Sequence, residues 1–500
     1  MKELEQLRTR LAEIRHIRAA AGVLGWDQST YLPPGARAAR GRHMSTLSRI
    51  AHEKATDPAV GRLLDACEKW AEGQPPDSDD VALLRVCRRD YDRATRVPSE
   101  FVARWAALRS ESFGAWAKAR PENDVAAVLP YLERMIDMSR AYSAFFPEAE
   151  HVADPHIALS DYGMTAATIR DVFARLRAEL VPLVKAIAAR PPADDACLRQ
   201  PFSRKGQEAF FTQVIRDFGY DYNRGRHDVA PHPFTTSFSV TDVRITVRYR
   251  DNYLGDAIFS AFHEAGHALY QQGINPAYED TPLCHGTSSG AHESQSRLWE
   301  NVVGRSLGFW SHYYPKLQAI FPDELKGVSL DTFYRAVNKV KPSLIRTDAD
   351  EVTYNLHPML RFDLELAMLE GNLAAKDLPD AWNARYESDL GILPPDHRDG
   401  VLQDMHWYSG RVGGAFQGYT LGNILSAQFY NAALRAHPEI PSETESGRFG
   451  TLHAWLKDNI YQHGGKYDTA ELVELVTGGP LRIEPYVAYL KATYGALYNL

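Results

Sequence analysis

Apolar residues recur at intervals of three and four along most of this 500-residue chain, a spacing typical of amphipathic helices. The first stripe consists of Leu4, Leu7, Leu11 and Ile14. Segments rich in Pro, Gly and Asp interrupt the pattern at residues 31–35, 73–77, 191–195 and 221–233. None of these segments has the length or bias of a domain linker, and the chain has no internal repeat. The pattern therefore predicts one large, predominantly α-helical body.

One region departs from the helical pattern and alternates between apolar and polar residues. Residues 242–250 place four side chains on one face of a strand: Val243, Ile245, Val247 and Tyr249. The preceding segment, 234–240, is rich in Thr and aromatic residues. We expect the two segments to pair as a β-hairpin, giving a small antiparallel β-sheet directly before the segment that carries the chemistry.

Composition and charge narrow the class of protein. The chain has 56 Lys and Arg against 64 Asp and Glu, a net charge of −8, which does not suit extensive binding of nucleic acid. No run approaches 18 apolar residues, so no membrane span is expected. The first six residues are charged where a secretory signal is apolar, and the four cysteines lie far apart. These features favour a cytoplasmic protein with reduced thiols.

The strongest chemical signal lies in residues 255–270. On a helix, His263 and His267 are one turn apart on the same face, so both imidazoles can bind one metal ion. Glu264 lies beside them, and the three residues form the HExxH pattern of zinc peptidases. Gly273, followed by Asn275 and a proline, is expected to end this helix. A pair of helical histidines without a metal is the alternative, so a third ligand is needed.

Catalytic zinc takes three protein ligands and leaves a fourth position for water. Tyr270 and Gly273 stand where the longer metzincin pattern needs Gly and His, which excludes that class. A second helix is expected to open near residue 291, and Glu293 is its best candidate for the third ligand. His285 and His292 are weaker alternatives, because their settings are equally typical of loop or cap histidines.

Further motifs resemble those of the thermostable metallocarboxypeptidase family, also called the carboxypeptidase Taq family. They are His232–Phe234 (HPF), Asp242–Thr246 (DxRxT), His292–Gln295 (HES-Q), Ile345–Asp350 (IRxxAD) and Gly400–Trp407 (GxxQDxHW). Residues 24–28 also look like the family, so the resemblance covers nearly the whole chain. One departure is Gln417-Gly418, which stands where the family usually has Pro-Thr. This replacement predicts a looser turn before Tyr419, with consequences for loop geometry and preferred peptide length.

The resemblance implies a fold, a reaction and a cofactor. The fold would be a helical zinc peptidase with a deep groove, a single domain over residues 1–500. Residues 1–230 would cover the groove, and residues 231–500 would form the catalytic part. The enzyme would be a cytoplasmic homodimer that releases single amino acids from free C-termini of peptides with broad specificity. Its metal would be Zn²⁺, for which Co²⁺ can substitute, with Glu293 as the third ligand.

Roles for individual residues follow from this resemblance and from the chemistry of peptide hydrolysis. Glu264 would accept a proton from the zinc-bound water as that water attacks the scissile carbonyl. Tyr419, preceding a long apolar helix, and His406 are candidate donors to the oxyanion. Their alternative interpretation is packing, which Trp407 beside His406 also favours.

A carboxypeptidase must also bind the terminal carboxylate, and arginine suits this task because its planar fork gives two charge-assisted hydrogen bonds. Arg346 is the leading candidate, although Asp348 and Asp350 could pair with it instead. Arg244 and Arg411 are lesser candidates, and Arg244 is better suited to supporting the groove wall.

Two other functions remain open from the sequence. An oligoendopeptidase or dipeptidyl peptidase could use the same zinc residues on a different peptide bond. A catalytically inactive peptide-binding scaffold is the other alternative, but Glu264 argues against it, because such a scaffold has no need of a base.

Overall fold

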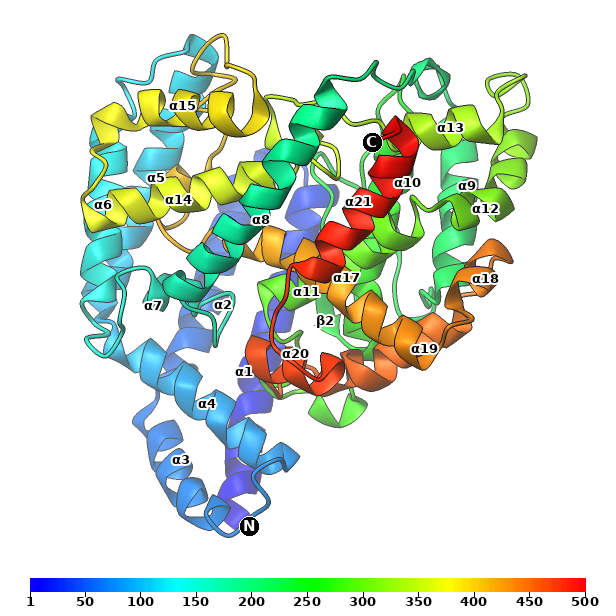
Figure 1. The fold of residues 1–500 in the computed structure, drawn as a ribbon. Coiled ribbons are helices and arrows are strands. Elements are labelled where there is room, and N and C mark those ends of the chain that lie inside the picture. The colour runs from blue at the N-terminus through cyan, green and yellow to red at the C-terminus, as the bar shows by residue number, and fades with distance from the viewer.

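The computed structural model describes residues 1–500 and confirms a predominantly helical fold (Figure 1). The first half contains α1 (Lys2–Thr30), α2 (Arg37–Ala55), α3 (Pro58–Ala71), α4 (Asp79–Arg96), α5 (Ser99–Glu122), α6 (Leu129–Ser143), α7 (Asp154–Ile157), α8 (Ala166–Ala188) and α9 (Arg204–Phe218). The predicted apolar stripe of α1 is buried, and α1 ends where the sequence predicts a break.

The second half contains α10 (Gly255–Gly273), α11 (Ser289–Arg297), α12 (Leu307–Ile320), α13 (Leu330–Val337), α14 (Leu356–Glu370), α15 (Leu378–Leu390), α16 (His406–Ser409), α17 (Gln417–Ala436), α18 (Ile440–Glu445), α19 (Gly450–Asn459), α20 (Thr469–Thr477) and α21 (Glu484–Tyr498). A π-helical stretch, η4 (Leu298–Val303), continues α11. The 3₁₀ turns are η1 (Pro34–Ala36), η2 (Ala196–Leu198), η3 (Pro276–Tyr278), η5 (Arg346–Asp348), η6 (Ala375–Asp377) and η7 (Tyr461–His463). None of the helices combines the length and apolar character that crossing a membrane requires.

The predicted hairpin is confirmed, and a third strand joins it. Strand β2 (Thr235–Ser239) pairs antiparallel with β3 (Asp242–Val247), with Thr236 opposite Arg244. Strand β1 (His227–Val229) pairs with β3 in parallel, so the sheet has the order β1-β3-β2 and is mixed. Strand β1 lies within residues 221–233, which the sequence predicts to be an interruption between helices and not a strand. Thr246, on the polar face of β3, is also buried, and its hydroxyl donates to the carbonyl of Phe234.

Two large apolar clusters form the interior. One is built around α9, α10, α12 and the sheet, and the other around α8, α14, α15 and α21. In Figure 1, α5, α6, α14 and α15 lie on one side of the molecule, α9, α12 and α13 on the other, and α10, α11 and α17 between them. Helix α17 joins the clusters, since Leu425 and Phe429 belong to the first and Leu421 and Ile424 to the second.

Candidate metal centre

Helices α10, α11 and α17 approach one another closely, and two glycines allow this. A Cβ atom on Gly266 of α10 would lie 2.4 Å from the carbonyl oxygen of Gln295 in α11. A Cβ atom on Gly422 of α17 would lie 2.5 Å from the Cγ of Glu293. Any larger residue would push these helices apart. The glycines therefore bring the histidines of α10 within reach of Glu293.

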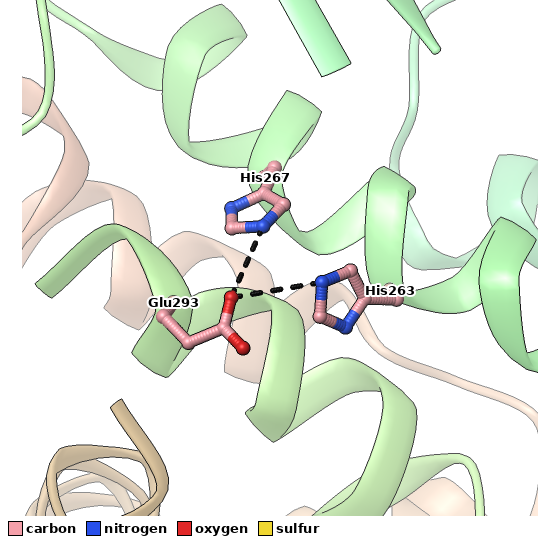
Figure 2. Close-up of side chains that lie close together, drawn as sticks. All are labelled: His263, His267 and Glu293. Atoms are coloured by element: carbon pink, nitrogen blue, oxygen red, sulfur yellow. Dashed lines mark ion pairs between the residues drawn. The ribbon is translucent and has the colours of Figure 1, made fainter. Parts of the chain in front are cut away.

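Figure 2 shows the cluster that results, in which two imidazoles face one carboxylate. The Nε2 atoms of His263 and His267 lie 3.6 and 3.3 Å from Oε2 of Glu293. Tetrahedral ligands at about 2.0–2.1 Å from zinc would lie about 3.3 Å apart, so this spacing fits such an ion. The ligand atoms of all three residues lie within 4.8 Å of one another. The predicted third ligand, Glu293, is therefore the one that the fold brings to both histidines.

Glu300 orients the first histidine. Its Oε2 lies 2.9 Å from Nδ1 of His263, which fixes the proton on Nδ1 and leaves Nε2 free to bind a metal. Burial alone would raise the pKa of Glu300, but Arg297 and the hydrogen bond from His263 lower it to about 2. Glu300 therefore remains a carboxylate that accepts this hydrogen bond at ordinary pH.

Glu293 is held with its Oε2 toward the histidines. Arg297 donates from Nε to Oε1 over 2.8 Å, and Ser296 donates to Oε2 over 3.0 Å. Burial alone would raise the pKa of Glu293, but Arg297 and the two histidines hold it well below its usual value. The carboxylate is thus ionised, as a metal ligand must be.

The two alternative histidines lie outside this cluster. Nδ1 of His292 is 2.6 Å from Nδ1 of His267, on the far side of that ring from Glu293, and the His292 ring stacks on Tyr270. His285 instead contacts the carbonyl of Gly286. His292 therefore contacts His267 from the side away from Glu293 and does not reach the cluster itself.

Glu264 lines the same cavity as the ligands, a space of about 1000 Å³. Its side chain is buried, and the hydroxyl of Thr235 donates to Oε2 over 2.6 Å. Thr235 belongs to β2, so the sheet beside α10 fixes the position of this carboxylate. A base held in this way can face a water molecule next to the ligand cluster.

Arg346, in η5, also lines this cavity and belongs to a buried cluster of charges. Its Nε lies 3.3 Å from Oδ2 of Asp404, and the same oxygen accepts from Arg361 over 2.9 Å. Asp404 also contacts Nδ1 of His406. Because a single carboxylate serves two guanidinium groups, the cluster keeps an excess positive charge. Burial alone would lower the pKa of Arg346, but Tyr354 and Asp404 raise it above its usual value.

Two other arginines that line the cavity form close ion pairs with carboxylates. Arg248 donates to both oxygens of Asp256 over 2.7 and 2.8 Å, and Arg250 lies 2.9 Å from Asp348. The alternative pairing of Arg346 with Asp348 is therefore not the one observed. Arg346 is the cavity arginine best placed to accept a further anion.

Tyr419 lines the cavity, and its ring lies under the guanidinium of Arg346, 4.8 Å from it. Burial raises its pKa to about 12, so the phenol stays protonated and can donate. Tyr419 does not precede the long helix, as the sequence suggests, but lies in the first turn of α17. His406 stands behind it, in contact with Asp404, and does not line the cavity.

The structure also differs from the predicted loose turn at Gln417-Gly418. Both residues are buried in the first turn of α17. The Gln417 amide donates to the buried carboxylate of Asp161 over 2.9 Å and to Ser160 over 2.8 Å. Asp161 also accepts from the backbone N–H of Gly290 at the start of α11. Gln417 thus fastens α17 to the helix that carries Glu293.

The remaining two candidates lie elsewhere. Arg244 forms two hydrogen bonds of 2.8 Å with Asp242, and its guanidinium lies over Trp26, which suits support of the wall. Arg411 lines a neighbouring cavity, over the rings of Trp105 and Tyr142.

Sequence reasoning did not single out the residues that hold the ligands and the proposed base, of which Glu300 and Thr235 are two. Glu300 lies seven residues after Glu293, two helical turns along the same face, and this spacing could have indicated it. Thr235 had no such signal, because strand pairing brings it to Glu264.

Comparisons with known proteins agree with this geometry. Residues 6–494 match the family model of the carboxypeptidase Taq (M32) metallopeptidases. The chain is 38% identical to thermostable carboxypeptidase 1 of Thermus thermophilus, covering 97% of each chain. It is 33% identical to carboxypeptidase 1 of Bacillus subtilis, covering 98% of this chain and 97% of that protein. The crystal structure of an M32 carboxypeptidase from Deinococcus radiodurans is 47% identical, with a TM-score of 0.98 and complete coverage of both chains.

Proposed function

Because the chain belongs to the carboxypeptidase Taq (M32) family of metallopeptidases, and is therefore a peptide hydrolase, we propose that it is a zinc carboxypeptidase of broad specificity. It releases single amino acids from peptides with a free C-terminus. One observation carries the proposal: a single cavity contains the three-ligand cluster, the buried carboxylate of Glu264 and the incompletely neutralised Arg346.

Zn²⁺ fits the donor set of His263, His267 and Glu293, and Co²⁺ accepts the same ligands. A bound ion of this kind supplies a Lewis acid that polarises the scissile carbonyl and makes a water molecule more acidic. Glu264 accepts the proton of the attacking water and passes it to the leaving amine. Thr235 holds the carboxylate in position for both transfers.

Arg346 and Tyr419 bind the groups that carry negative charge during the reaction. Arg346 binds the terminal carboxylate, since Asp404 neutralises only part of the charge that it shares with Arg361. Tyr419, whose phenol stays protonated, donates a hydrogen bond to the oxyanion that forms at the scissile carbonyl. His406 acts through Asp404 and the Tyr419 ring rather than on the substrate.

The test compares an unblocked peptide with its C-terminal amide, each incubated with zinc-loaded protein and followed by mass spectrometry. Stepwise loss of single residues from the free acid, with little reaction of the amide, is the expected result. Internal cleavage or release of dipeptides would support the oligoendopeptidase or dipeptidyl peptidase alternative instead. A panel of C-terminal residues then measures the breadth of specificity.

The proposal extends to assembly and location. Residues 1–500 act as one peptidase domain in a cytoplasmic homodimer, with residues 1–230 covering the groove formed with the catalytic part. In support, residues of α1, α4 and α5 line a cavity together with His292. Light scattering on the purified protein tests the dimer, and cell fractionation tests the compartment.

A further inference from the structure

A second cavity, of about 1100 Å³, adjoins the metal centre, and we call it the arginine cavity. His292 lines both cavities, and it contacts the metal-ligand candidate His267. The arginine cavity therefore lies next to the ligand cluster, at His292.

Charge in this cavity is strongly one-sided. Five arginines line it, with Asp90 as the only acidic residue: Arg18, Arg89, Arg93, Arg109 and Arg411. Asp90 is already paired with Arg89, at 2.9 Å. The protein as a whole carries a net charge of −8, so this is a local reversal of sign. A concave site lined by one sign of charge concentrates ligands of the opposite sign.

Two of these arginines are half-buried and have no carboxylate partner. Arg93 donates to the backbone carbonyl of Ala158 over 3.1 Å. Arg411 lies against aromatic rings, with its guanidinium 4.6 Å from the centre of Tyr142 and 5.1 Å from that of Trp105. Burial lowers the pKa of both arginines, and Arg93 adds to this effect on Arg411. A buried charge is costly unless an anion accompanies it.

The direction of the substrate identifies that anion, and this step rests on the proposed function. A carboxypeptidase substrate has one residue beyond the scissile bond and all its other residues before it. We infer that, with Arg346 holding the terminal carboxylate in the metal cavity, the preceding residues extend past His292 into the arginine cavity. The arginine cavity then selects peptides with Glu or Asp shortly before the scissile bond, and Arg93 and Arg411 bind their carboxylates.

The test uses N-acetylated pentapeptides with a free C-terminus, in which Glu, Gln or Lys occupies each of the first three positions in turn. At one or more positions, kcat/KM for Glu should exceed that for Gln by about tenfold, with Lys lowest, since charge-assisted hydrogen bonds are the stronger ones. Raised ionic strength should shrink the preference. Equal values for Glu and Gln at low salt would overturn the inference.

Variants then assign the preference to residues. Arg93→Gln and Arg411→Gln should each reduce it severalfold, while Arg411→Lys, which keeps the charge, should retain most of it. Arg49→Gln is the matched control, because Arg49 is exposed on α2 and pairs with Glu53. A preference that survives both glutamine variants, or that Arg49→Gln also removes, contradicts the assignment.

Binding separates this inference from the proposed function. Fluorescence anisotropy of labelled Glu and Gln pentapeptides on the Glu264→Gln variant measures selection without hydrolysis. If this variant prefers the Glu peptide while the zinc-loaded wild type hydrolyses neither peptide, the proposed function is refuted and the inference stands. Normal hydrolysis with no selection would do the reverse.

Discussion

The arginines of the two cavities that share His292 have different partners. In the metal cavity, Arg248 is paired with Asp256 and Arg297 with Glu293, at 2.7 and 2.8 Å. In the arginine cavity, Arg93 and Arg411 contact a carbonyl group and aromatic rings. An arginine with a carboxylate of its own holds other side chains in place. An arginine without one, or one that shares a carboxylate as Arg346 shares Asp404 with Arg361, can bind a ligand. Residue type alone does not separate these roles, but the surroundings of each side chain do.

The largest effect is expected from Glu264→Gln, which removes the proposed base without touching either set of arginines. General acid–base catalysis contributes about 10²–10⁴-fold, so activity should fall at least that far. Zinc content and peptide affinity should stay near those of the wild type, because Glu264 lies outside the ligand cluster. Metal analysis and steady-state kinetics measure the two properties. A variant within tenfold of the wild-type rate would exclude the role.

Arg346→Ala is expected to have the next largest effect. Loss of one partner of a buried charge pair costs about 2–5 kcal/mol, or roughly 30- to 5,000-fold in kcat/KM on free-acid peptides. The preference for acid over amide should collapse, and Arg346→Lys should restore only part of it, since lysine lacks the planar fork.

Arg411→Gln is the matched control for Arg346→Ala, because it removes an arginine from the other cavity. It should leave the ratio of acid to amide hydrolysis unchanged. If Arg411→Gln removes the preference for free-acid peptides and Arg346→Ala does not, the terminal carboxylate is bound in the arginine cavity. The roles assigned to the two cavities would then be exchanged.

The contrast also explains what could be predicted from the sequence. Helical spacing indicated His263 and His267, which lie one turn apart on α10. Glu293, about thirty residues further along on α11, was indicated by the expected second helix and by the family motif. The hairpin was readable because β3 alternates strictly, while β1, three residues long, carries no pattern of its own. Family motifs pointed to Arg346, but not to its sharing of Asp404.

The arginine cavity could not be predicted in this way. Arg18, Arg93 and Arg411 come from α1, α4 and the segment before α17, and hundreds of residues separate the first from the last. Each is an ordinary charged residue in its local sequence. Only tertiary packing brings them around one space and leaves them without carboxylates.

Glu300→Gln tests whether the ion-paired residues of the metal cavity support metal binding. Its expected effect on activity is smaller than those above. The amide oxygen of the variant can still accept a hydrogen bond from His263. It lacks the negative charge that stabilises the proton on Nδ1 of His263. Changes to such partners of metal ligands typically cost about 10–100-fold in metal affinity. Zinc competition with a chelator measures the loss, and excess zinc should restore most of the activity. Glu53→Gln, on an exposed helix, is the control. Unchanged zinc affinity would argue against an orienting role.

The smallest effect on activity is expected for a change at Glu351. Its side chain is buried like that of Glu300, but its surroundings raise the pKa, whereas those of Glu300 lower it. Glu351 accepts hydrogen bonds from Tyr494 and Tyr489, over 2.7 and 3.2 Å, and has no ion pair. Burial raises its pKa to about 7, although the tyrosine hydrogen bonds and Arg305 oppose this. The folded protein therefore binds a proton here more tightly than the unfolded chain, whose carboxyl keeps the usual value of 4.5.

The sign of the pH dependence follows from this difference. Between about pH 4.5 and 7 the folded state carries the extra proton, so this residue's contribution to the free energy of unfolding is complete below pH 4.5 and is lost as pH rises through 7. The shift corresponds to about 3 kcal/mol.

Glu351→Gln, a neutral amide of the same shape, should remove the pH dependence. Its free energy of unfolding should match that of the wild type near pH 4.5 and exceed it by up to about 3 kcal/mol at pH 8. Urea unfolding at several pH values measures the difference. Parallel curves for the two proteins would show that Glu351 is ionised in the folded state and that a nearby cation, such as Arg305, outweighs its burial.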